Sequence, residues 1–140
     1  MKKAAILALV VLAGASVAAA QQTKAKPAPA AATASDSGKE MYSAYCGSCH
    51  GADAHGNGPA TPALKKVPPD LTALAKNSGG KYPSAKVYHV IQGDPDLPAH
   101  GSKTMPVWGP IFLEMNKLDR GKTQQRIQNL ADYIGTLQRK

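Results

Sequence analysis

The chain is short of large apolar side chains. Of its 140 residues, one is Phe, one is Trp and five are Tyr, whereas 13 are Gly and 11 are Pro. A domain of this size buries only about 60–65% of the surface that its unfolded chain exposes. So few large side chains leave little material for a core, and the composition favours a fold that is completed by a bound apolar group.

Other features that the sequence lacks exclude further classes of protein. No cluster of Lys or Arg is interleaved with aromatic residues, which argues against binding of nucleic acid. No internal repeat is visible, so the folded part is one small domain. The 17 Lys and Arg outnumber the nine Asp and Glu, for a formal net charge of +8, but four of these lysines precede residue 27. The domain itself is therefore modestly basic, which suits transient docking on an acidic protein surface.

The first 36 residues have the composition of processing and linker segments. Lys2 and Lys3 precede an apolar run, and Ala18-Ala19-Ala20 supplies the small residues that signal peptidase needs, which predicts a signal peptide over 1–20. A retained membrane anchor is the alternative, which the Ala and Gly in the second half of the run disfavour. Residues 21–36 lack periodicity and predict a disordered Ala/Pro/Lys tether. The folded domain is then expected over 37–140.

The densest chemical signal is the stretch Cys46-Gly47-Ser48-Cys49-His50, which has the spacing C-x-x-C-H. Two sulfurs at this spacing can add to two vinyl groups on one edge of a porphyrin, and His50 can then ligate its iron. We therefore predict one covalently attached haem c. Two alternatives remain. A redox-active dithiol prefers a βαβ setting that this sequence does not have, and a zinc site would need further ligands from His55, His89 or His100.

The stretch 94–110 carries the second signal. Its four prolines and two glycines forbid a continuous helix and predict a stiff, irregular segment. Met105, followed by Pro106, is predicted to be the sixth iron ligand, because a thioether is a soft, neutral donor that favours Fe(II). His100 is the competing ligand in the same stretch. Trp108 is expected in the core, with a haem propionate as the partner of its indole N–H.

The residues that follow His50 predict a loop over 51–59, since Gly, Asn and Pro dominate them. A haem-ligating imidazole usually donates its outer N–H to a backbone carbonyl. A carbonyl near Pro59 or Pro62 is the expected acceptor, and His55 is expected to face solvent.

Helices are expected on both sides of this loop. The predicted ranges are 37–45, 71–75 with Asp70 as N-cap, 84–93, and 123–138. In the last of these an apolar stripe recurs at helical spacing and is formed by Ile127, Leu130, Ala131, Ile134 and Leu137. Gly38 begins one face of the first helix, and the absence of a side chain there would let the last helix approach closely.

These features together resemble a class I cytochrome c of the exported bacterial, single-haem type. The matching residues are Gly38-x3-Tyr42-x3-Cys46, the CGSCH motif, the Gly56-Asn57-Gly58-Pro59 turn, Met105-Pro106 with Trp108, and Leu130-Ala131-Asp132-Tyr133-Ile134. The resemblance spans 38–137. It implies an all-α fold of three to five helices around one haem, with the first and last helices crossing, and axial ligation by His50 and Met105.

Such a protein would be a periplasmic electron carrier and not an enzyme, because a six-coordinate iron has no open site for substrate. Its expected partners are an oxidase, reductase or dehydrogenase with an acidic docking face. We expect a monomer that contacts the membrane only if the signal segment is retained. The alternatives are a haem sensor or peroxidase-like enzyme in which Met105 is displaceable, and a zinc-binding module built on Cys46, Cys49, His50 and a distant histidine.

Overall fold

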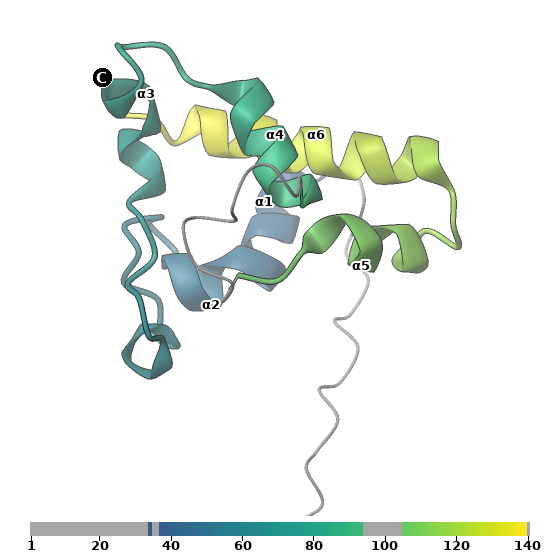
Figure 1. The fold of residues 1–140 in the computed structure, drawn as a ribbon, viewed down its shortest axis with the longest axis horizontal. Coiled ribbons are helices and arrows are strands. Elements are labelled where there is room, and N and C mark those ends of the chain that lie inside the picture. Colours follow the sequence, from purple (N-terminus) through teal and green to yellow (C-terminus); the bar gives the residue numbers. More distant parts are fainter. Residues whose placement is uncertain (1–33, 35–36, 94–104, 140) are drawn as a thin grey trace, which may run out of the picture.

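The computed structural model describes residues 34, 37–93 and 105–139. Over these residues the chain is helical and contains no strand, and its helices are arranged around a common core (Figure 1). The all-α prediction is confirmed. The signal peptide predicted over 1–20, and all but residue 34 of the predicted tether, lie outside the described residues.

The first helix carries the haem motif within it. It consists of α1 (Gly38–Met41), a π-helical turn η1 (Tyr42–Cys46) and α2 (Gly47–His50). The hydroxyl of Ser37 caps it by accepting a hydrogen bond from the backbone N–H of Glu40, at 3.2 Å. The predicted end at residue 45 is wrong. The helix continues to Gly51, whose φ of 83° is a conformation that glycine adopts readily.

The remaining helices surround the first one. Two short 3-10 turns follow it, η2 (Thr61–Ala63) and η3 (Leu71–Ala73), and η3 leads directly into α3 (Leu74–Asn77). The last three helices are α4 (Ser84–Gln92), α5 (Trp108–Met115) and α6 (Arg120–Thr136). Asp70 caps η3 as predicted, accepting a hydrogen bond from the backbone N–H of Thr72 at 2.8 Å. The prediction of a helix over 84–93 is also confirmed, and Gly93 ends it with a left-handed φ of 90°.

Two predicted boundaries are wrong for local reasons. Helix α5 begins inside the stretch predicted to be irregular, because Pro110 lies in its first turn, where the missing N–H is not needed. Helix α6 begins at Arg120 and not at Thr123, because the Asp119 carboxylate accepts the backbone N–H of Lys122 at 3.0 Å. Residues 94–104 of the irregular stretch lie outside the described part of the chain.

The first and last helices meet at Gly38. A Cβ atom at this position would overlap the backbone oxygen of Asn129 in α6. Nearby, the rings of Tyr42 and Tyr133 lie 5.6 Å apart between their centroids. The close approach predicted from Gly38 is therefore confirmed, and it fixes the position of the haem motif relative to α6.

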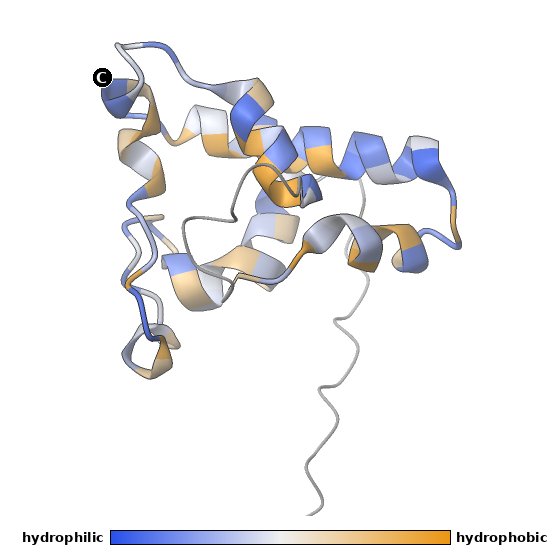
Figure 2. Ribbon diagram, in the orientation of Figure 1, coloured by the Kyte–Doolittle hydropathy of each residue, from blue (hydrophilic) through white to orange (hydrophobic). Residues whose placement is uncertain are grey.

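Helix α6 forms one wall of the core. The predicted apolar stripe faces inward: four of its residues are buried and the fifth is partly buried, in the order Ile127, Leu130, Ala131, Ile134 and Leu137. Figure 2 shows hydrophobic and hydrophilic residues alternating along this helix, as expected for a helix that packs one face against the core and exposes the other to solvent. Helices α1, α4 and α5 all pack against it.

Candidate functional site

Two adjoining hollows lie beside the first helix and share four lining residues, Cys46, His50, Pro69 and Met105. Their open volumes, solvent at the mouth included, are about 560 and 820 Å³. Most of the other lining residues are apolar, among them Leu64, Val67, Trp108, Leu71, Leu74, Val87, Val90, Ile91 and Ile134. The walls therefore suit a large, flat, apolar group.

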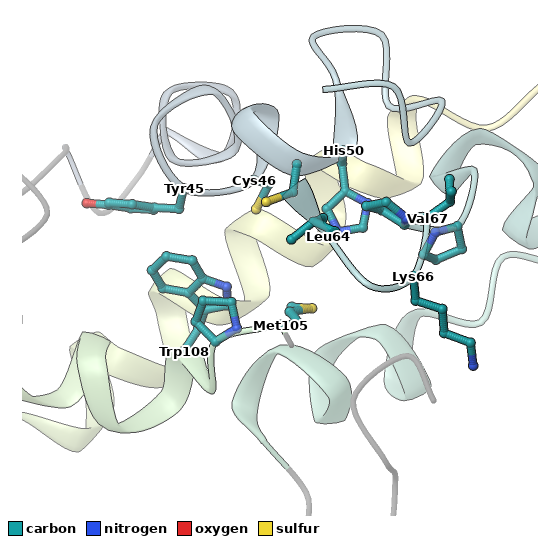
Figure 3. A pocket seen from close by; sticks show the side chains of 12 residues that line it. Tyr45, Cys46, His50, Leu64, Lys66, Val67, Met105 and Trp108 are labelled. Carbon is teal, nitrogen blue, oxygen red and sulfur yellow. The ribbon is translucent and has the colours of Figure 1, made fainter. Parts of the chain in front are cut away.

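The donor atoms of the site come from two elements that face each other. Cys46 and His50 project from the first helix on one side of the hollow, and Met105 and Trp108 lie on the opposite side (Figure 3). Met105 is partly buried and packs against the core. A thioether and an imidazole on opposite walls of an apolar space are donors of the kinds that ligate haem iron in cytochromes c.

The His50 imidazole is held in the state that binds metal. Its side chain is buried, and this burial lowers the pKa of His50 below the usual value, while a hydrogen bond to the backbone carbonyl of Pro69 acts in the opposite direction. The ring is therefore neutral near pH 7, as ligation of iron requires.

The backbone carbonyl that affects the pKa of His50 is thus that of Pro69 and not the one near Pro59 or Pro62 that the sequence predicted. Pro59 is exposed and lines neither hollow. The turn that contains it packs on the backbone of the first helix, since the Gly58 N–H donates to the Cys49 carbonyl at 3.2 Å. The chain passes the motif a second time at Pro69, which lines both hollows together with His50.

The two cysteines form no disulfide, and Cys46 lies in a setting that disfavours disulfide exchange. Burial, and secondarily the neighbouring Cys49, raise the pKa of Cys46 to about 12. Redox-active dithiols have a thiol with a lowered pKa, because the thiolate is the nucleophile. The environment of Cys46 therefore argues against the dithiol alternative.

The histidines proposed for a zinc site have other neighbours. His55 Nδ1 lies 3.3 Å from Asp70 Oδ2, and the His89 ring stands edge-on to Tyr88. Within residues 37–93 and 105–139, no three His, Cys, Asp or Glu side chains are grouped as they would be around a metal ion. His100 lies outside the described residues.

Trp108 is part of an aromatic cluster behind the first hollow. It is 8% exposed, its ring stacks on Phe112 at 5.5 Å, and Tyr45 lies at 5.2 Å. The prediction that Trp108 belongs to the core is confirmed. A hydrogen bond from its indole N–H to a haem propionate stays a prediction.

Sequence reasoning missed two parts of this region. The first is the segment between η2 and η3, which lines the first hollow with Leu64, Lys66, Val67, Pro68 and Pro69. The Pro68-Pro69 pair stiffens an extended chain and was the sequence feature that could have indicated this segment.

The second is Arg126, which is 4% exposed and whose guanidinium lies 5.5 Å over the Phe112 ring. No sequence pattern pointed to it, because a charged residue beside an apolar stripe is usually solvated.

Comparison with known proteins identifies the family. The family model described as cytochrome c matches residues 35–138, well over half of the 140 residues. Comparison with curated proteins gave no match, and neither did comparison with solved structures. Among the described residues, no helix is both long and apolar enough to cross a membrane. The apolar hollow, its opposed donors and the paired thiols fit the haem c that this family attaches covalently. The chain therefore belongs to the cytochrome c family and is a haem-binding electron-transfer protein.

Proposed function

We propose that this cytochrome c carries single electrons in the periplasm on a haem ligated by His50 and Met105 and attached through Cys46 and Cys49. The observation that supports this proposal is the placement of Met105 across the hollow from Cys46 and His50 (Figure 3). The bound haem supplies a reversible Fe(III)/Fe(II) couple.

The residues of the chain have separate roles in this proposal. His50 is buried, which lowers its pKa and keeps the ring neutral, so it can donate to the iron on one face of the haem. Met105 is a soft donor that favours Fe(II) and raises the reduction potential. With both positions filled the iron has no open site, so the protein transfers electrons without acting on a small substrate.

The surface around the hollows supports an acidic protein partner. Lys66 lines the first hollow and Lys86 the second, so a positive charge borders each. Val67, beside Lys66, is 72% exposed and offers an apolar contact. Lysines around a small apolar patch suit a transient complex, in which charge guides the encounter and a small contact area allows rapid release.

The proposed periplasmic location rests on the predicted signal peptide over 1–20 and on the attachment of haem c, which in bacteria takes place outside the cytoplasm. Cleavage after Ala20 predicts a mature protein that starts at Gln21. Mass spectrometry of the protein recovered from the periplasm checks this start. Recovery of the full-length chain in the membrane fraction would support the retained anchor instead.

The visible absorption spectrum of the purified protein tests the main proposal. We expect a sharp Soret band, an α band in the reduced form, and a weak far-red band in the oxidised form, which reports the bond from methionine sulfur to iron. A haem spectrum that lacks the far-red band and binds added carbon monoxide would indicate the sensor or peroxidase-like alternative. A colourless protein would contradict the proposal.

A further inference from the structure

One basic side chain of helix α6 is buried. Arg126 lies next to Ile127 of the apolar stripe and is buried like it, whereas the other two basic residues of this helix, Arg120 and Lys122, are exposed. Removal of a charge from water is costly. A charge in such a place also acts strongly on its surroundings, because little water screens it.

Aromatic side chains connect Arg126 with the wall of the first hollow. The guanidinium carbon lies 5.5 Å from the centroid of the Phe112 ring. Phe112 in turn stacks on Trp108, with 5.5 Å between centroids, and lies 5.4 Å from Tyr45. Trp108 and Tyr45 line the first hollow together with Met105. Phe112 thus contacts both the cation and the two aromatic residues of the wall.

The side chains that connect Arg126 with the hollow exclude water. Phe112 is fully buried, and Trp108 and Tyr45 are buried as well. The effective dielectric constant in such surroundings is far below that of water, so the field of a charge reaches further. The positive charge of Arg126 should therefore be felt inside the first hollow, although Arg126 lines neither hollow.

We propose that Arg126 raises the reduction potential of the haem by placing a permanent positive charge behind the aromatic wall of the first hollow. The oxidised haem carries one positive charge more than the reduced haem, so a fixed cation disfavours Fe(III) relative to Fe(II). Arginine suits this role because its guanidinium is always charged. The inference rests on the proposed function as a carrier of single electrons.

Arg126 changes the balance of the redox step and not its chemistry. The iron is reduced from Fe(III) to Fe(II) by one electron that a donor protein gives up, and it returns to Fe(III) when an acceptor protein takes that electron. No bond forms or breaks at Arg126, and no proton leaves it.

Replacement of Arg126 by Met removes the charge and keeps a long side chain against Phe112. Arg126→Gln is a second neutral variant, and Arg126→Lys keeps the charge when it is measured at pH 6, where lysine is protonated. Arg120→Met is the matched control, because it removes an exposed charge from the same helix. The reduction potential of the full, haem-loaded protein is measured at low and at high salt concentration, and the far-red band verifies that the iron ligands are unchanged.

We expect both neutral variants at position 126 to have a lower reduction potential. At the solution potential where half of the parent is reduced, their ratio of reduced to oxidised protein should fall on the order of fivefold, the size expected for one poorly screened charge. The shift should persist at high salt, since salt screens buried charges weakly. Arg126→Lys should resemble the parent, and Arg120→Met should differ from it slightly at low salt only.

A potential equal to the parent's in Arg126→Met would overturn the inference, and Arg126→Gln decides if the Met variant fails to fold. An equal fall in Arg126→Lys would overturn it too, because the shape of the side chain and not its charge would then matter. So would a shift that vanishes at high salt. In each of these cases the parent keeps its haem spectrum and the proposed function stands, whereas a colourless parent would overturn both.

Discussion

At the scale of single residues, the identity of the sixth ligand decides the chemistry of the iron. An imidazole is the better σ-donor and stabilises Fe(III), whereas a thioether stabilises Fe(II). Met105 lines both hollows and packs against the core, while His100 lies outside the described residues. From the place of Met105 across the hollow from His50, we expect the thioether to ligate the iron and the reduction potential to be clearly positive.

Replacement of Met105 by Ala should remove the far-red absorption band and open the iron to added carbon monoxide, because Met105 is the donor that the described residues place across the hollow from His50. The measurements are the oxidised visible spectrum and a carbon monoxide titration of the reduced protein. His100→Ala is the control and should leave the spectrum and the potential nearly unchanged. The opposite pattern in the two variants would indicate a bis-histidine cytochrome with a lower potential.

The residues of the site differed in how far the sequence could predict them. Cys46, Cys49 and His50 are adjacent in sequence, so local spacing alone brings them together. Met105 was predicted from the chemistry of its side chain and from its proline-rich setting. The Pro69 carbonyl was not predicted, because a backbone acceptor has no residue type to recognise, and its position depends on how the chain returns past the first helix.

At the scale of elements, the contact between the first and last helices depends on one glycine. Gly38→Ala would place a methyl group into the backbone of α6 at Asn129. Overpacking of this kind costs about 1–3 kcal/mol, more than the roughly 1 kcal/mol that alanine gains over glycine in a helix. We expect a lower midpoint of thermal unfolding, measured by circular dichroism.

A second helical glycine provides the control for this prediction. At Gly47 the nearest atom to an added Cβ is the Tyr42 carbonyl oxygen, at 3.7 Å, an ordinary contact. Gly47→Ala should therefore leave stability unchanged or raise it. If Gly38→Ala were as stable as Gly47→Ala, the contact with α6 would not be tight enough to require glycine.

Helix boundaries were predicted less well than the helices themselves. The apolar stripe of α6 identified that helix because periodicity persists over several turns. Its start was misplaced because Asp119 can cap a helix or simply lie in a turn, and only its contact with the Lys122 N–H distinguishes the two. The first helix was ended at residue 45, where the haem motif begins, whereas it continues through that motif to His50.

At the scale of the whole molecule, three carboxylates connect stability to pH. Hydrogen bonds lower the pKa values of Asp53, Asp70 and Asp119 below the ordinary 3.8. The folded protein then binds fewer protons than the unfolded chain, so their stabilisation is complete above pH 3.8 and is lost as the pH falls through the folded pKa values. The midpoint of thermal unfolding should fall steeply below about pH 4.

Asp119→Asn provides a check on that acid sensitivity, since an amide cannot titrate. Its unfolding midpoint should be lower than the parent's near neutral pH, because the charged cap is weakened, and the gap should narrow as the pH falls below about 4. A constant difference between the unfolding midpoints of the parent and Asp119→Asn across this pH range would show that Asp119 does not contribute to the loss of stability in acid.

The core itself should depend on the covalent group. The walls of the two hollows are apolar side chains that would face solvent or collapse if the haem were missing, and the chain has only one Phe and one Trp to compensate. Joint replacement of Cys46 and Cys49 by Ala removes both attachment points. It does not weaken the first helix itself, because alanine has the highest helix propensity. We expect this variant to show residual helix without a cooperative thermal transition, followed by circular dichroism. A cooperative transition at the parent's temperature, in a protein free of haem, would show that the side chains alone complete the fold and that the scarcity of aromatic residues does not limit it.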